Sequence, residues 1–270
     1  MRCTVVGSYP GGSLELAVAD QLAAGIDLLS DGQTRADMIS AFLTHIPGCE
    51  RRPGGRWAVT RRIGAPGAPI TVADWQTATS LAAGRPVKGI LTGPTTLACA
   101  VAVAPGAPYA GPGDPALVAD FAAVLADEAK ALIAAGARII QIDEPFFSMG
   151  ADVAALAAVT SAIAEPWLHC CGDLRGAWPV LRNAQVSVLQ IEATCTDRLP
   201  ADLTAAAQLA FGVIDSATDE VERLETVCER IRRLPVTAAT WLSPDCGLRL
   251  RSREAARRKL AVLAQAVHSL

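Results

Sequence analysis

The chain has 270 residues, of which 51% are apolar, and its formal net charge is −3. This length suits one large domain, residues 1–270, with a substantial buried core. The slight negative charge, with Arg dispersed among Asp and Glu, argues against binding to nucleic acid or to an anionic membrane. No apolar run is long enough for a signal peptide or a membrane span, so we expect a cytoplasmic protein whose eight cysteines stay reduced.

Short apolar or β-branched runs alternate with longer helical patterns, which is the rhythm of a parallel sheet covered by helices. Eight runs indicate strands, at residues 3–9, 26–32, 87–93, 138–144, 166–170, 186–192, 209–215 and 236–242. Eight parallel strands with intervening helices close into a barrel. The sequence therefore predicts an α/β fold of the (β/α)8 TIM barrel type, in a single domain.

Two of the intervening helices carry clear signals. Asp114 and Pro115 indicate an N-cap and a first helical residue, and Gly136 marks the end of that helix. In the segment 219–234, apolar residues recur at the spacing that buries one helical face. Both helices are expected in the outer ring of the barrel.

Two segments interrupt the alternation. Residues 48–69 are rich in Arg, Gly and Pro, and they predict a hairpin over one mouth of the barrel. The arginines of this segment favour a solvated surface, with docking of an acidic partner as the alternative. Residues 104–115 predict a second loop of the same kind.

Polar residues gather where the predicted strands end. They are Ser8, Gln33, Thr92, Asp143, His169, Cys171, Glu192, Asp215 and, in the loop after the last strand, Cys246. In a barrel these ends share one face, and barrel enzymes place their active sites there because the loops vary without disturbing the packed interior. The sequence therefore predicts an active site at this face.

The fifth predicted strand runs into WLHCCGD, which holds one of only three histidines. Side chains alternate sides along a strand, so His169 and Cys171 point the same way and Cys170 points to the other side. Glu192 and Cys246 lie near the ends of the next strand and of the last one. A histidine, a carboxylate and two thiolates are the donors of a tetrahedral zinc site.

Each of these residues also has an ordinary structural interpretation. A His-x-Cys pair often packs in a core, Cys246 could be a small residue in a turn, and Glu192 could end in a surface ion pair. Their joint placement on one barrel face, in a chain with so few histidines, favours the metal site.

Such a ligand set indicates one kind of chemistry. Two thiolates and a carboxylate more than neutralise Zn²⁺, so the ion is a poor Lewis acid for polarising a carbonyl. A substrate thiol that binds it loses its proton near neutral pH yet stays nucleophilic. The expected reaction is alkyl transfer to a thiol, because a hydrolytic zinc site would use more histidines than this chain has.

Several motifs resemble, in order, those of the C-terminal catalytic barrel of the cobalamin-independent methionine synthases. They are VGSYP (6–10), DGQTRADM (31–38), LTGPTT (91–96), IQIDEP (140–145), HCCG (169–172), IEA (191–193) and PDCGLRLR (244–251). The resemblance covers essentially the whole chain. It implies a zinc-dependent S-methyltransferase of methionine biosynthesis that methylates homocysteine.

The resemblance also implies roles for individual residues. His169, Cys171, Glu192 and Cys246 match the zinc ligands of the family. The implied substrate-binding residues are Gly7, Ser8, Gln33 and Asp143, with Asp143 also the catalytic residue. Physically, a carboxylate at the mouth can pair with the ammonium of homocysteine, and backbone N–H groups near Gly7 and Ser8 can receive its carboxylate.

The sequence departs from the longer members of the family on the side of the methyl donor. Those members carry a second, N-terminal barrel that helps to bind methyl-folate. Gln33 replaces a glutamate, Ala100 replaces a tryptophan that stacks on the pterin, and no histidine lies near GVIDSATDE to protonate the folate. The chain thus resembles the short, single-barrel forms, for which a methylated corrinoid protein is the implied donor and partner.

The sequence leaves other functions open. The same zinc could act on another thiol such as coenzyme M, or on another alkyl donor such as an epoxide. A folate-dependent methionine synthase that needs a partner protein is a further possibility. From a different class, the barrel could be a non-catalytic interaction scaffold, which predicts no thiol-dependent change at the metal.

Overall fold

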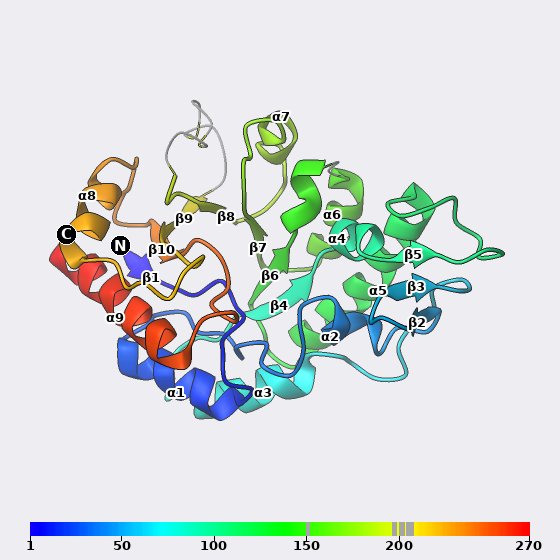
Figure 1. The fold of residues 1–270 in the computed structure, drawn as a ribbon, viewed down its shortest axis with the longest axis horizontal. Helices are drawn as coiled ribbons and strands as arrows, with labels where there is room; N and C mark the ends of the chain where they lie inside the picture. The colour runs from blue at the N-terminus through cyan, green and yellow to red at the C-terminus, as the bar shows by residue number, and fades with distance from the viewer. Residues whose placement is uncertain (150–151, 196–198, 200–202, 204–207) are drawn as a thin grey trace.

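The computed structural model describes residues 1–149, 152–195, 199, 203 and 208–270 (Figure 1). Its strands are β1 (Arg2–Cys3), β2 (Cys49–Arg51), β3 (Trp57–Val59), β4 (Gly89–Thr92), β5 (Ala102–Val103), β6 (Ile139–Asp143), β7 (Glu165–Cys170), β8 (Val188–Glu192), β9 (Gln208–Ile214) and β10 (Trp241–Pro244). Its helices are α1 (Leu14–Ala24), α2 (Ser40–Leu43), α3 (Val72–Leu81), α4 (Pro94–Cys99), α5 (Pro115–Ala134), the 3-10 helix η1 (Pro145–Met149), α6 (Val153–Thr160), α7 (Trp178–Leu181), α8 (Leu224–Arg232) and α9 (Arg253–Ser269). In these ranges no helix is long and apolar enough to cross a membrane.

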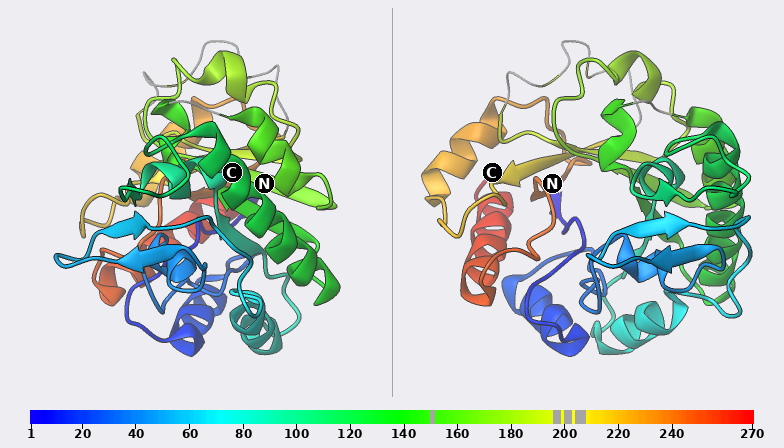
Figure 2. Two further views of the ribbon diagram at one scale, coloured as in Figure 1. Left: turned by 90° about the vertical axis from the view of Figure 1, so that its right-hand side faces the viewer. Right: turned by 45° about the vertical axis from the view of Figure 1, so that its right-hand side comes forward.

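Seven parallel strands form the central sheet, in the order β1-β10-β9-β8-β7-β6-β4. The segment at Leu28 and Leu29 joins its two edges, because Leu28 bridges to Thr4 beside β1 and Leu29 bridges to Val87 beside β4, both in parallel. The ring therefore closes with eight parallel segments, and helices surround it (Figures 1 and 2). The predicted α/β barrel is confirmed.

Five predicted strands, at 87–93, 138–144, 166–170, 186–192 and 209–215, are confirmed as β4, β6, β7, β8 and β9 with small changes at their ends. The first predicted strand is too long, since regular pairing covers only Arg2–Cys3 and then a single bridge at Thr4. Its remaining residues, 5–9, form the irregular segment that enters the active-site face.

Two other predicted strands are shorter than expected, because hydrogen bonds to side chains replace strand pairing there. The strand at 26–32 is reduced to isolated bridges because the Ser30 N–H donates to Oε1 of Gln21 (2.9 Å) instead of to a neighbouring strand. The last strand begins at Trp241 and not at 236, because Thr237 and Thr240 form a turn before it. The Thr237 N–H donates to Oγ1 of Thr240 at 2.8 Å.

The two predicted helices have different outcomes. Helix α5 is confirmed: the Asp114 side chain accepts from the Ala116 N–H, and Gly136, with φ of +108°, follows its end. Helix α8 begins at Leu224 and is shorter than the predicted 219–234. Its first predicted turn is lost because Asp219 accepts from the Ser252 N–H and Glu222 accepts from the Asp215 N–H, which hold this segment as a loop.

The predicted hairpin in residues 48–69 is confirmed as the antiparallel pair β2 and β3, and β5 adds to β3 in parallel. This small sheet lies beside the barrel and next to α2, where Nε1 of Trp57 donates to Oγ of Ser40 (Figure 1). Residues 104–114 contain no helix or strand, as expected for the second loop. Both segments follow carboxyl ends of barrel strands, so they border the active-site face.

The barrel interior is packed separately from the layer between sheet and helices. Leu28, Trp167, Val188, Ala210 and Trp241 form its apolar cluster, in which the two tryptophan rings meet edge to face with centroids 5.4 Å apart. Buried polar side chains lie on the same strands, among them Lys88, Gln141, Gln190 and Ser243. Buried polar groups need hydrogen-bond partners, and Lys88 and Gln141 have theirs in Val5, Val6 and Asp143.

Candidate active site

A cavity of about 320 Å³ lies at the carboxyl ends of the barrel strands. It is lined by Val6, Ser8, Gln33, Asp37, Met38, Asp143, Pro145, His169, Cys171, Cys246, Gly247, Arg249 and Leu250. Six residues predicted from the sequence are among them: Ser8, Gln33, Asp143, His169, Cys171 and Cys246. Thr92 and Asp215 are not, since Thr92 donates to the Met38 carbonyl and Asp215 accepts from the Ala217 N–H.

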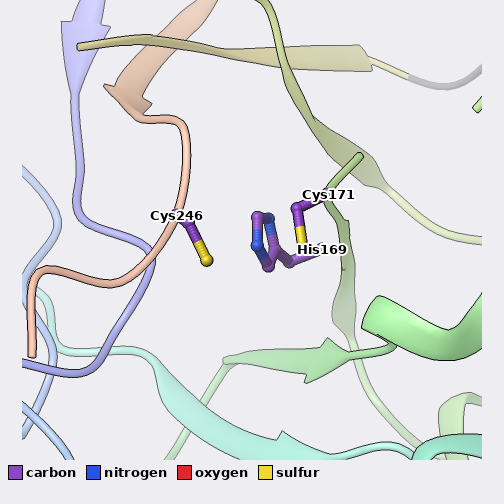
Figure 3. A group of neighbouring side chains, drawn as sticks. All are labelled: His169, Cys171 and Cys246. Atoms are coloured by element: carbon purple, nitrogen blue, oxygen red, sulfur yellow. The ribbon is translucent and has the colours of Figure 1, made fainter. Parts of the chain in front are cut away.

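Three predicted metal ligands converge in this cavity (Figure 3). One donor atom each of His169, Cys171 and Cys246 lie within 4.8 Å of one another. His169 and Cys171 come from the end of β7, and Cys246 comes from the loop after β10 (Figure 3). Cys170 is fully buried in the hydrophobic core on the other side of the strand, as the alternation of side chains predicts.

His169 carries the clearest sign of a missing partner. It is only 3% exposed, yet neither ring nitrogen has a hydrogen-bond partner in the described part of the chain. A buried imidazole without partners is costly, whereas a metal ion would satisfy one ring nitrogen. The donor set of one nitrogen and two sulfurs is the kind that Zn²⁺ prefers.

The three side chains also perturb one another. A hydrogen bond from the Cys171 thiol, together with the neighbouring His169, lowers the pKa of Cys246 to about 4. The pKa of Cys171 is raised, by this hydrogen bond and then by burial. Burial works against the charged form of His169, but Cys246 and Asp143 outweigh it and raise its pKa. The arrangement of the three side chains thus favours the thiolate form of Cys246.

Glu192 ends β8 beside this cluster but is not one of the three grouped donors. Its Oε2 accepts a hydrogen bond of 3.0 Å from the Gly172 N–H. Gly172 follows Cys171 directly and has a φ of +85°, a conformation that favours glycine. Glu192 therefore holds the turn that carries Cys171, and its role as the fourth ligand stays a prediction.

Asp143 lies at the end of β6 and faces the cavity. It is 4% exposed, and its Oδ1 accepts from Nε2 of Gln141 at 2.5 Å. Burial raises the pKa of Asp143 to about 6, while His169, the Gln141 amide and Lys88 act in the opposite direction. A buried carboxylate at a cavity wall can bind a cationic group of a ligand.

Ser8 lines the cavity, and Gly7 precedes it in the segment between β1 and α1 but does not line it. A Cβ atom at Gly7 would lie 2.6 Å from Cδ1 of Ile90 and 3.0 Å from Oε1 of Gln33, so a larger residue would displace the ends of these two side chains. The Ser8 carbonyl accepts from the Leu248 N–H at 2.8 Å, which joins the first barrel segment to the loop of Cys246. The segment that carries Ser8 and the loop that carries Cys246 are therefore held together by a direct backbone hydrogen bond.

Comparison with known proteins identifies the family. The family described as "Cobalamin-independent synthase, Catalytic domain" matches residues 10–269. The chain belongs to this family. A methionine synthase from Methanothermobacter thermautotrophicus is 35% identical, and the match spans 96% of this chain and 97% of the relative.

The cobalamin-independent synthase fold is also found among solved structures. A B12-independent methionine synthase from Shewanella sp. W3-18-1, in complex with selenomethionine, has a TM-score of 0.83 at 22% identity, with 99% of this chain and 97% of that chain covered. A 5-methyltetrahydropteroyltriglutamate–homocysteine methyltransferase from Herpetosiphon aurantiacus is 30% identical over 87% of this chain, but over only 35% of its own length. The resemblance noted in the sequence is confirmed at the level of the family.

Three residues in or beside the cavity, Arg249, Lys88 and Gln141, were not predicted from the sequence. Arg249 lines the cavity and donates through Nη1 to the carbonyls of Gln33 (2.9 Å) and Ala36 (2.8 Å), which fixes Gln33 at a φ of +43°. Lys88 and Gln141 lie below Asp143 in the barrel interior. Their signal was present, since each is a polar residue inside an otherwise apolar strand run.

Proposed function

We propose that this chain transfers a methyl group to the sulfur of homocysteine and so forms methionine, with Zn²⁺ as its cofactor. The observation that carries the proposal is one cavity in which the cluster of His169, Cys171 and Cys246 faces the buried carboxylate of Asp143. A thiol-binding metal site and an ammonium-binding carboxylate, side by side, suit an amino acid with a thiol at its other end.

The residues fit a zinc ion. His169 offers a ring nitrogen without a protein partner, Cys246 favours the thiolate form, and Cys171 is close to both. We assign Glu192, next to this cluster, as the fourth ligand. When bound, zinc would favour the ionised form of an incoming thiol near neutral pH and would thus supply the nucleophile.

The chain's own residues orient the substrate. Asp143 binds the ammonium group through its cavity-facing oxygen, and the backbone at Gly7 and Ser8 receives the carboxylate. The apolar side chains of Val6, Met38 and Pro145 line the rest of the cavity and limit water around the sulfur. Held at both ends, the thiolate can attack a methyl carbon in line with its leaving group.

For the methyl donor we propose a methylcorrinoid, free or carried by a protein. A folate nitrogen leaves poorly unless it is protonated, and this requires an acid near the cavity. The chain has three histidines: His169 belongs to the proposed ligand set, His45 is exposed in a loop, and His268 bonds to the Ala264 carbonyl in α9. A cobalt donor needs no acid, because the electron pair of the broken Co–CH3 bond stays on cobalt as the S–CH3 bond forms.

The test is to incubate the zinc-loaded protein with homocysteine and, in separate reactions, with methylcobalamin or 5-methyltetrahydrofolate, and to measure methionine. We expect methionine from methylcobalamin at a rate well above that from methyl-folate. Robust turnover with methyl-folate and no added protein would overturn the donor assignment. Methylation of coenzyme M in preference to homocysteine would overturn the substrate assignment.

A further inference from the structure

Lys88 is a charged residue inside the barrel. It is one of only three lysines in the chain and is 1% exposed. Its ammonium donates to the Val5 carbonyl and to Oε1 of Gln141, each at 2.5 Å, and lies 5.2 Å from the ring centroid of Trp167. Burying an ammonium group costs desolvation free energy unless the group has partners, so packing alone does not account for a lysine at this position.

The ammonium determines which way the Gln141 amide points. Lysine has donors only, so the atom of Gln141 that faces it must be the carbonyl oxygen. The amide nitrogen then faces the other way and donates to Oδ1 of Asp143 (2.5 Å) and to the Val6 carbonyl (2.8 Å). With a reversed amide, Gln141 would present an oxygen to the Asp143 carboxylate, and both contacts would be lost.

This chain of contacts leaves the Asp143 carboxylate in one orientation. Its Oδ1 accepts from Gln141, so the second oxygen is the one available to the cavity that Asp143 lines. Because Lys88 fixes the Gln141 amide, it also fixes which carboxylate oxygen is held inside the barrel.

The same network also holds the segment that leads into Gly7 and Ser8. The two carbonyls that accept from Lys88 and Gln141 belong to Val5 and Val6, immediately before Gly7 and Ser8. Lys88 thus joins, directly and through Gln141, the carboxylate proposed for the ammonium of the substrate and the backbone proposed for its carboxylate.

We propose that Lys88 is a positioning residue for the amino-acid end of the substrate: through Gln141 it orients the Asp143 carboxylate and sets its distance from the Gly7–Ser8 backbone. This inference rests on the proposed function, because it assumes that Asp143 receives the ammonium group. It assigns no contact between Lys88 and substrate.

The test compares two ligands that differ only in the amino group, homocysteine and 4-mercaptobutanoate, by calorimetric titration of the zinc-loaded protein. Lys88→Met keeps the length of the side chain and removes its charge and donors. We expect this variant to bind homocysteine at least about tenfold more weakly, to bind 4-mercaptobutanoate within about twofold of the parent protein, and to keep its zinc.

The matched control is Lys259→Met, since Lys259 is also fully buried and also donates to backbone carbonyls, those of Asp215 and Glu220, none of which lines the cavity. Both lysine variants lose a buried ammonium and should lose thermal stability, but only Lys88→Met should change the ratio of the two affinities. A merely structural lysine would leave that ratio unchanged.

Gln141→Glu tests the same proposal if Lys88→Met does not fold. This variant preserves an acceptor for Lys88 but removes the donor to Asp143 and places a second carboxylate beside it. It should therefore also weaken the binding of homocysteine more than that of 4-mercaptobutanoate. Asp143→Asn serves as the reference. If Asp143→Asn lowers the preference for homocysteine and neither Lys88→Met nor Gln141→Glu does, the inference is overturned alone; if Asp143→Asn has no effect either, the proposed ammonium pocket fails.

Discussion

The two sides of the barrel mouth are built differently. On the side of β6 and β7, Asp143 and His169 are almost fully buried, and both are tied to neighbouring strands. On the side of the β2–β3 hairpin and the loop after β10, Leu250 is 83% exposed and the arginines of the hairpin reach solvent. The difference fits the proposed function, in which a small thiol binds in a preorganised pocket and a large methyl donor arrives at the open surface.

The largest expected effect comes from removing a sulfur ligand of the proposed metal site. Cys171→Ser or Cys246→Ser should reduce zinc from about one ion per chain to a trace and abolish methionine formation, because a four-ligand site does not survive the loss of a thiolate. Metal analysis after dialysis checks the content. The control is Cys170→Ala, which changes the adjacent cysteine but lies in the hydrophobic core.

Cys170→Ala should keep its zinc, at a cost of about 1 kcal/mol in the free energy of unfolding. Loss of zinc in this variant, with retention in Cys171→Ser, would mean that the alternation of side chains along β7 does not decide which sulfur binds the metal.

The next largest effect tests the amino-acid pocket. Asp143→Asn removes the charge that faces the ammonium group, so KM for homocysteine should rise by about a hundredfold, as for a hydrogen-bonded charge pair left incomplete. Zinc content should not change. Steady-state assays with homocysteine and 4-mercaptobutanoate give the comparison, and an equal loss for both thiols would argue against an ammonium pocket.

The sequence predicted the barrel well where apolar runs coincide with regular pairing, as in β6 to β9. The prediction failed where hydrogen bonds to side chains replace backbone pairing between strands. The Ser30 N–H bonds to Gln21, and Thr237 bonds to Thr240, so the second and the last strands are shortened or shifted. Such bonds compete with strand pairing, but composition alone does not reveal which partner a hydroxyl or amide will find.

The residues of the candidate site were also only partly predictable from the sequence. Strand ends and side-chain alternation were enough to bring His169, Cys171 and Cys246 together, because the carboxyl ends of parallel strands meet on one face. The supporting residues could not be found by that reasoning. Lys88 contacts Gln141, 53 positions away, and Arg249 contacts Gln33, 216 positions away. Only the closed barrel brings these pairs into contact.

A smaller effect is expected at Glu192, at the end of β8. If Glu192 is the fourth ligand, Glu192→Gln should raise Kd for zinc by about ten- to a hundredfold while the Gly172 turn stays intact, because glutamine keeps an oxygen for the Gly172 N–H. Competition with a chelator measures the change. An unaltered Kd would mean that the carboxylate serves only to hold the turn that carries Cys171.

The smallest effect should come from the open side. Arg51 and Arg56 are exposed on the β2–β3 hairpin, and in the described chain neither has an ion pair within 4.0 Å. Replacing both by glutamate should change the free energy of unfolding by no more than about 0.5 kcal/mol and KM for homocysteine by less than about twofold. Chemical denaturation and steady-state assays check both values.

Arg62→Glu is the matched control for the hairpin pair, since Arg62 is equally accessible but donates to both oxygens of Asp120. It should destabilise the protein slightly, yet more than the double replacement does, because it alone breaks a formed ion pair. With free methylcobalamin, all three substitutions should leave methyl transfer nearly unchanged, since the donor then carries no protein surface to match. A different result would identify the hairpin as a docking surface: the double replacement would slow transfer only from a protein-bound donor, and it would do so less at high salt. The open side would then select its donor protein, as the buried side selects its thiol.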